Sequence, residues 1–225
     1  MTVAASADAA ATVALLREAG RHVITGNCEE ALGTGASECG CSFAEGSACD
    51  GLADAWYRHA DATLGREERA WMRSLPRRTG SAVDGHRFVI VHGSPERISA
   101  FVFATTPDEE IERRLAGAGG VAGGRRGLPF SQVLGGRLWH NPGVIGMLAN
   151  DGTAHEWFSV LRPQGDRLWV EHFPLDYDHA AAAAMRTAAL PESYATAPTT
   201  GLWPSCDVLP PAELAVRVDG WSREC

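Results

Sequence analysis

The segment "HRFVIVHGSP", residues 86–95, constrains the fold more than any other part of the sequence. Residues 88–91 are apolar without alternation, which is the pattern of a strand that is covered on both faces. The pair Asp84-Gly85 precedes it and is typical of a tight hairpin turn after the run "TGSAV". A strand buried on both faces needs a layer on each side, so the sequence predicts a layered α/β domain.

Periodicity and punctuation predict the other elements. Helices are expected from a cap at Ser6 through residue 20, after a cap at Asp50, over 66–76, after a capping box formed by Thr106 and Glu109, and over 178–189. Further strands are expected over 22–25 and in two hairpins, one across Gly135-Gly136 and one across 163–165. Residues 31–50 have little period and are expected to form an irregular loop, within a Cys/Gly-rich insertion over 28–50.

Charge and hydropathy exclude several classes of partner. The formal net charge is -8, from 28 acidic against 20 basic residues, and no basic run exceeds a pair of arginines. Such a chain repels nucleic-acid backbones on average, so no nucleic-acid partner is expected. The first residues lack a basic leader, and no apolar run is long enough to cross a membrane. We therefore expect a cytoplasmic protein with no membrane partner.

Six cysteines are present, and Cys28, Cys39, Cys41 and Cys49 fall close together. In a chain without a secretory signal, thiols or a metal site are expected rather than disulfides. The spacing differs from the paired C-x2-C pattern that marks structural zinc. Two alternatives therefore stay open, buried thiols and a site for a soft metal such as zinc.

Two expected strands end on polar side chains. Asn27 follows the strand over 22–25, and His92 follows the buried strand over 88–91. In open α/β sheets, ligands bind at the carboxyl ends of the strands. An amide oxygen and an imidazole nitrogen together could supply half of the shell of a divalent metal, namely Mn, Fe, Ni or Zn. The alternative is a histidine that is only hydrogen-bonded, with no metal bound.

Four motifs in order, "ITGNCEE", "VIVHGSPERI", "LPFSQVLGGRLWHNPGVIG" and "FPLDYD", resemble those of the calcineurin-like metallophosphoesterases, most closely the small bacterial phosphodiesterase type. The resemblance covers roughly residues 7–178. It implies a four-layer α/β/β/α sandwich of two mixed β-sheets flanked by helices. It also implies two metal ions whose bound hydroxide attacks a phosphorus centre.

Matched position by position, the resemblance implies that Asn27 and His92 are metal ligands and that Cys28 lies near the leaving group. The family's opening Asp-x-His and Gly-Asp motifs have no counterpart in this sequence. At its late Gly-His-x-His motif, Arg125 takes the first histidine position and Gly127 the second. The matched ligands are neutral, and a guanidinium repels cations, so the sequence predicts a degenerate two-metal site.

The missing motifs also lead to expectations about the chain itself. The first β-α-β elements of the family fold are absent, so we expect that Met1 is an internal start of a longer reading frame. Residues 1–190 are expected to form the metallophosphoesterase-like domain, and residues 191–225 a Pro-containing tail. That tail could dock on the domain or on a second subunit, and a homo-oligomer stays open.

Three functional hypotheses follow. The first is hydrolysis of a small phosphate ester or phosphodiester by metal-activated water. The second is a pseudoenzyme that binds a phosphorylated small molecule or a protein, with Arg125 and Arg126 holding the phosphate by paired hydrogen bonds. The third is an interaction protein stabilised by zinc at the cysteines. The remaining polar candidates are expected at solvated turns and edges: Glu29, Glu30, His86, His140 and Asp151.

Overall fold

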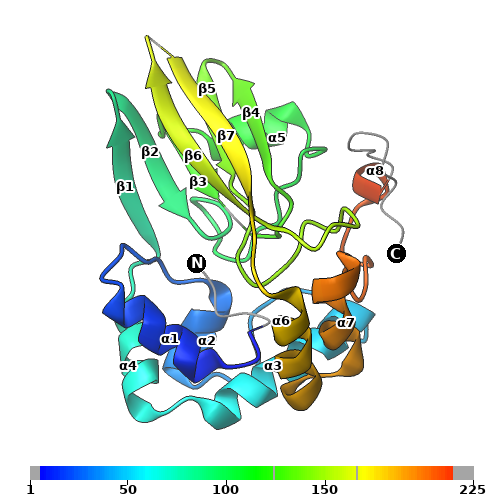
Figure 1. Ribbon diagram of the computed structural model, residues 1–225. Coiled ribbons are helices and arrows are strands. Elements are labelled where there is room, and N and C mark those ends of the chain that lie inside the picture. The colour runs from blue at the N-terminus through cyan, green and yellow to red at the C-terminus, as the bar shows by residue number, and fades with distance from the viewer. Residues whose placement is uncertain (1–5, 124, 166, 215–225) are drawn as a thin grey trace.

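The computed structural model describes residues 6–123, 125–165 and 167–214 (Figure 1). The part of the tail beyond residue 214 and the region of Met1 lie outside these residues. The helices of the described ranges are α1 Ala9–Glu18, α2 Asn27–Thr34, α3 Ala48–Thr63, α4 Arg66–Ser74, α5 Asp108–Arg114, α6 His179–Ala189, α7 Glu192–Thr200 and α8 Pro211–Leu214. The strands are β1 Arg78–Val83, β2 His86–Val91, β3 Gly120–Gly123, β4 Phe130–Leu134, β5 Arg137–Asn141, β6 Glu156–Gln164 and β7 Arg167–Leu175.

The larger sheet has five strands in the order β1-β2-β3-β5-β4. The three central strands β2, β3 and β5 are parallel, and the two edge strands β1 and β4 run antiparallel to their neighbours. Asp84 and Gly85 both have positive φ, as the predicted tight hairpin between β1 and β2 requires. Since parallel strands end at the same edge, the residues that follow β2, β3 and β5 lie near one another.

The two faces of this sheet are covered by different layers. Along β5, successive side chains point to opposite faces: Trp139 packs in a cluster with Ile111 and Leu115 around α5, whereas His140 bonds Ser159 of β6. The antiparallel hairpin of β6 and β7 forms the second sheet. The predicted α/β fold of two sheets with flanking helices is therefore confirmed, and the second sheet is this single hairpin.

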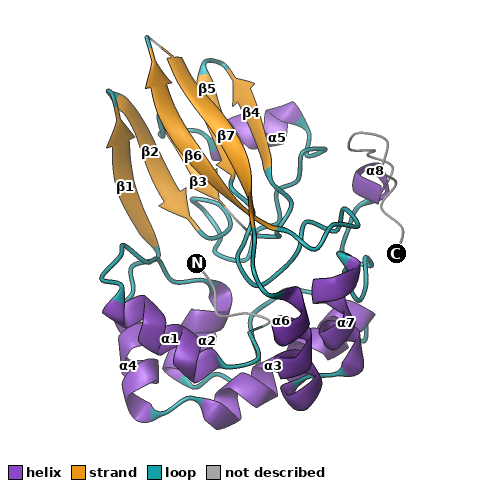
Figure 2. Cartoon of the chain, in the orientation of Figure 1, coloured by secondary structure: helices purple, strands orange, loops and turns teal. Residues whose placement is uncertain are grey.

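Helices α1 to α4, α6 and α7 gather beyond the edge at which the parallel strands end, and α8 lies apart from them (Figure 2). Their shared core contains Val13, Leu32, Trp56, Met72 and Leu190, which are buried. None of the helices in the described ranges is long and apolar enough to cross a membrane.

Three predicted helix caps were wrong. Ser47, not Asp50, caps α3, because its hydroxyl accepts a hydrogen bond from the Asp50 amide. Asp8, not Ser6, caps α1, because its carboxylate accepts a hydrogen bond from the Ala11 amide. The capping box before α5 does not form, since Thr106 uses its hydroxyl to accept a bond from Phe103 N and Pro107 takes the cap position.

The predicted strand over 22–25 was also wrong. These residues form no regular secondary structure and belong to no sheet. The amide of Thr25 donates to the carbonyl of Pro76 at 2.9 Å, and the described residues place no strand beside this segment. A strand needs a hydrogen-bonded neighbour, so Ile24 and Thr25 are buried without forming one, and His22 is exposed. The loop predicted from residue 31 is likewise shorter, because α2 runs to Thr34.

The described part of the tail packs on the domain. Trp203 and Leu209 share a buried cluster with Phe103 and Leu128, which precede and follow β3 in the chain. The Trp203 indole N–H donates to Leu148 O at 2.6 Å, and its backbone N–H donates to Asn150 Oδ1 at 2.7 Å. The sequence left open whether the tail docks on the domain or on a second subunit, and this segment packs on the domain.

Candidate functional site

A cavity of about 130 Å³ lies where the parallel strands end. Its wall includes all five residues that the sequence singled out: Asn27, Cys28, His92, Arg125 and Arg126. His92 directly follows β2 and Arg125 comes soon after β3, so the parallel strands β2 and β3 deliver them side by side. Asn27 and Cys28 reach the same place from the first turn of α2.

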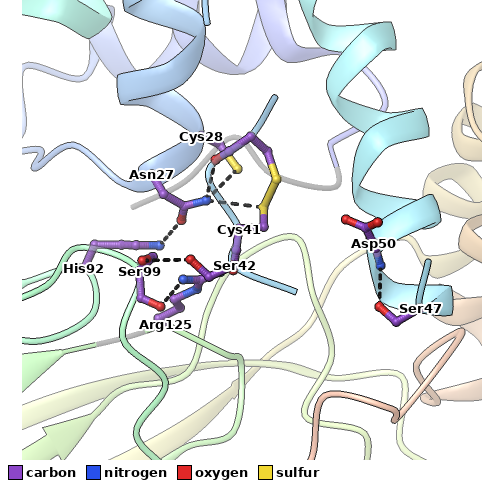
Figure 3. Close-up of a disulfide and its surroundings, with 10 residues drawn as sticks. Asn27, Cys28, Cys41, Ser42, Ser47, Asp50, His92, Ser99 and Arg125 are labelled. Carbon is purple, nitrogen blue, oxygen red and sulfur yellow. Dashed lines mark hydrogen bonds between the residues drawn. A yellow bond between two sulfur atoms is a disulfide. The ribbon is translucent and has the colours of Figure 1, made fainter. Parts of the chain in front are cut away.

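Asn27 and His92 are bonded to each other. The Oδ1 atom of Asn27 lies 2.8 Å from Nε2 of His92, and both side chains are buried. An amide oxygen only accepts, so we assign the imidazole proton to Nε2. Burial lowers the pKa of His92 to about 3, and the positive charge of Arg125 acts in the same direction. The ring is therefore neutral in this site at physiological pH. Figure 3 shows its hydrogen bond to Asn27.

Gly26 explains how these groups approach so closely. A Cβ atom at this position would lie 2.5 Å from Oε2 of Glu29 and 3.1 Å from Nδ1 of His92. The Glu29 carboxylate accepts a hydrogen bond from the Gly26 amide at 2.9 Å, which fixes the start of α2. Glu29 is only 2% exposed, so its predicted place at a solvated turn was wrong.

Cys39 and Cys41 form a disulfide. The expectation that this group of cysteines would hold no disulfide was therefore wrong for this pair, whereas Cys28 and Cys49 are buried thiols. The Asn27 amide nitrogen donates to Cys39 O at 2.8 Å, to Cys41 Sγ at 3.3 Å and to Cys28 Sγ at 3.5 Å (Figure 3). Two cysteines that are close in sequence do not by themselves predict a disulfide. Here the fold of residues 39–41 brings the two sulfur atoms together.

Burial raises the pKa of the Cys28 thiol, and the nearby carboxylate of Glu29 adds to the increase. The thiol is therefore neutral at physiological pH. A neutral thiol is a poor nucleophile, although it still carries a proton. Its predicted place near a leaving group stays a prediction.

Arg125 ties two loops together. Its guanidinium donates to the carbonyls of Ser99 and Cys41, and it stacks 4.2 Å from the ring centroid of Phe101. The side chain is buried rather than solvated, and burial lowers its pKa to about 9, with the charge of Arg126 acting in the same direction. Arg125 is thus still largely protonated at neutral pH, and two of its donors are used by backbone oxygens.

Arg126 differs from its neighbour. Its guanidinium carbon lies 4.7 Å from the ring centroid of Phe43, 5.2 Å from that of Phe101 and 5.5 Å from that of Trp203. Its Nε and Nη2 atoms are buried and have no hydrogen-bond partner in the described chain. Arg126 also has φ of +76°, in the left-handed region that costs a residue with a Cβ about 1–2 kcal/mol.

The motif "NPGVIG" holds the Arg126 backbone in this conformation. The Asn141 amide nitrogen donates to the carbonyl of Arg126 at 3.0 Å, and Asn141 Oδ1 accepts from the amide of Gly143 at 3.0 Å. Asn141 is 1% exposed and ends β5. The side-chain amide of Asn141 therefore positions Arg126 and does not line the cavity.

The residues of this cavity do not fit a two-metal centre. Two divalent ions bring about four positive charges, which such sites offset with carboxylates. No carboxylate lines the described wall of the cavity. Asn27 and His92 are neutral, and the atoms that would face a metal are hydrogen-bonded to each other. The guanidinium of Arg125 lies near them. Elsewhere, two groups of potential metal ligands lie close together: Cys28, Cys39 and Cys41, and His155, Asp176 and His179.

Sequence reasoning missed two features of this region. The rings of Phe43, Phe101 and Trp203 come from three loops far apart in the chain, so no periodicity links them. His140 was expected at a solvated edge but is 1% exposed, because the β6–β7 hairpin covers it.

No protein-family model and no curated protein matches the sequence. Solved structures do match its fold. One is the hypothetical protein PH1004 from Pyrococcus horikoshii OT3, with a TM-score of 0.68 and 16% identity over 87% of this chain and 79% of that one. Another is a metallophosphoesterase from Sphaerobacter thermophilus, with a TM-score of 0.61 and 20% identity over 88% and 84% of the two chains. The chain therefore has the fold of a metallophosphoesterase.

Proposed function

We propose that this chain binds a small phosphorylated molecule with a flat apolar part in the Arg126 cavity, without metal-dependent hydrolysis. One observation carries the proposal: two adjacent guanidinium groups are buried at the cavity, and neither forms an ion pair with any described residue. A buried charge is costly unless it is paired. An anion in the cavity would supply the missing pair.

The electrostatics of the wall support this choice. Burial lowers the pKa of Arg126, so an anion placed beside its guanidinium would favour the protonated form. The carboxylate of Asp207 favours the charged form of Arg126, and it also accepts a hydrogen bond from the Cys49 amide at 3.2 Å. The free Nε and Nη2 atoms of Arg126 can donate two parallel hydrogen bonds to one phosphate group.

The rest of the wall indicates what the phosphate would be attached to. Aromatic rings and apolar side chains dominate it, including Phe43, Trp56, Val144, Tyr194 and Trp203. Rings offer stacking surface for a flat group, and the volume suits a small molecule rather than a polymer. We therefore assign an aryl or similarly flat phosphate monoester as the ligand class.

Hydrolysis of a phosphate ester is the competing function. The fold is compatible with it, and Asn27 and His92 border the same cavity. The two proposals differ in one respect that can be measured, since hydrolysis of this type needs a metal whereas binding through Arg126 does not.

The experiment is calorimetric titration of the full chain with phenyl phosphate in the presence of a chelator. Two further ligands serve as separate arms. Inorganic phosphate lacks the ring and reports on the anion, and benzoate keeps the ring but replaces the phosphate with a carboxylate. Arg126→Gln removes the charge but keeps a polar side chain, and Arg113→Ala, an exposed position on α5, is the matched control. We expect binding that is at least about tenfold weaker in Arg126→Gln, since a charge-assisted pair is worth about 1.5–3 kcal/mol.

The outcomes separate the proposals. Metal-independent binding that needs Arg126 supports the binding protein. Benzoate binding more tightly than phenyl phosphate would overturn the phosphate assignment. Absence of binding by all three probes, or binding that appears only with added Mn²⁺, overturns the proposal. Turnover of an aryl phosphodiester with Mn²⁺ that His92→Ala abolishes would establish the hydrolase instead.

A further inference from the structure

The open end of the β6–β7 hairpin brings together three side chains that have no part in the Arg126 cavity. In the antiparallel register, Glu156 pairs with Leu175. His155 immediately precedes Glu156 in the chain, and Asp176 immediately follows Leu175, so both stand at the same end of the hairpin. His179, the first residue of α6, follows three residues later. One potential ligand atom from each of the three lies within 4.8 Å of the other two.

The imidazole nitrogens of this cluster are incompletely satisfied. The Nδ1 atoms of His155 and His179 are buried, and neither has a hydrogen-bond partner in the described chain. Nε2 of His179 lies 3.9 Å from Oδ1 of Asp176, which is too long for a hydrogen bond. Buried polar atoms in folded proteins normally have a partner, and an unsatisfied one calls for an explanation such as an ion.

We propose that His155, Asp176 and His179 bind a divalent transition-metal ion, with Zn²⁺ as the ion that fits the donors best. Two imidazole nitrogens and one carboxylate oxygen are a donor set that zinc accepts at about 2.0–2.2 Å. A tetrahedral ion with such bonds holds its ligands about 3.4 Å apart, so small side-chain rotations are sufficient. The Asp176 side chain is 93% exposed, which leaves the fourth position open to solvent.

The charges around the cluster favour a cation. Glu156 is buried nearby, and its carboxylate interacts with both His179 and Arg186. The amino end of α6 opposes a cation through its partial positive charge. Asp178 caps that end by accepting from the Ala181 amide at 2.8 Å, which reduces this effect. Asp176 belongs to the cluster, Asp178 adjoins His179 in the chain, and Arg186 is the cation that interacts with Glu156.

The cluster joins the end of β7 to the start of α6, which leads into α7 and the docked tail. A metal bound there would cross-link the hairpin to the helices, as structural zinc does in small domains. None of the three ligands lines the Arg126 cavity, so this site is independent of the proposed binding function.

The test is calorimetric titration of the full chain with Zn²⁺, after removal of any purification tag and of bound metal by a chelator. No reductant is added, so that Cys39 and Cys41 stay bonded and do not contribute thiolates. We expect one Zn²⁺ per chain, together with a rise in melting temperature. Co²⁺ in place of Zn²⁺ should show the intensified visible absorption of a tetrahedral site.

Four variants make the result decisive. Asp176→Asn changes an exposed group and should fold normally, yet weaken Zn²⁺ at least about tenfold. His155→Ala with His179→Ala should abolish binding, and His22→Ala, an exposed histidine, should leave it unchanged. His92→Ala separates this site from the cavity. The proposal is overturned if Zn²⁺ does not bind, if Asp176→Asn binds it as tightly as the parent, or if only His92→Ala abolishes binding.

Discussion

Oδ1 of Asn27 and Nε2 of His92 lie 2.8 Å apart, so two residues predicted as metal ligands act as hydrogen-bond partners of each other. The same amide also donates to the carbonyl of Cys39 at 2.8 Å. Asn27 therefore joins the end of β2 to the disulfide loop. This relationship assigns a structural role to a residue whose motif suggested only a chemical one.

Replacing Asn27 by Ala should lower the free energy of unfolding by about 2 kcal/mol, because it leaves the His92 N–H and the Cys39 carbonyl buried without partners. Urea denaturation followed by circular dichroism measures the change. Gln164→Ala removes an exposed amide and should change the stability by less than about 0.5 kcal/mol. Equal effects of the two variants would contradict the role assigned to Asn27.

The Cys28 thiol should react slowly with iodoacetamide at pH 8 in the folded protein. Burial raises its pKa, so little thiolate is present, and the side chain is 5% exposed. Mass spectrometry of the tryptic peptide measures the labelling over time. The same protein in guanidinium chloride is the reference and should be labelled far faster. Equal rates in the two conditions would show that Cys28 is accessible or ionised in the fold.

His140 should make the protein less stable as the pH falls. Burial, with the nearby His172 acting in the same direction, lowers its pKa from 6.5 to about 4. Between these values the unfolded chain binds a proton that the folded chain does not, so the free energy of unfolding falls by up to about 3 kcal/mol from pH 6.5 to pH 4. Above pH 6.5, His140 adds no pH dependence to the free energy of unfolding.

Urea denaturation across this pH range tests the effect of His140. His140→Gln should flatten the curve, whereas His22→Gln at an exposed site should retain the slope of the parent protein. His92 contributes a loss of the same sign, which continues to lower pH because its pKa is about 3. A parent slope unchanged by His140→Gln would refute the assignment.

Trp203→Ala should destabilise the protein by about 3–5 kcal/mol, the usual cost of removing a buried aromatic side chain. It also removes the indole bond to the Leu148 carbonyl. Trp169→Ala on β7 is the matched control, since that ring is 58% exposed and should cost little. Thermal unfolding compares the two. A small effect at Trp203 would mean that the tail is not part of the cooperative unit.

Local patterns predicted much of the fold. The Asp84-Gly85 turn, the buried strand after it and the hairpins around Gly135-Gly136 and Gly165 depend on neighbours in sequence, and all were confirmed. The strand over 22–25 was not, because a strand exists only with a partner and the pattern of one segment cannot report what lies beside it.

The site shows the same division. Strand ends predicted that Asn27 and His92 would lie close together, the resemblance placed Arg125 with them, and all three line one cavity. Which donors are already occupied could not be predicted, because Arg125 bonds carbonyls from loops 84 and 26 positions away. The cluster of His155, Asp176 and His179 escaped notice for a related reason. Its ligands become neighbours only through the register of a hairpin.

The alternation along β5 has one more consequence. Trp139 faces the apolar layer under α5, and His140 bonds Ser131 and Ser159 on the opposite face. A slip of one residue would exchange these two environments, pressing an imidazole into the apolar cluster and an indole against two hydroxyls. Both changes cost free energy, so this pair of side chains favours the native register of β5. That register places Asn141 beside Arg126.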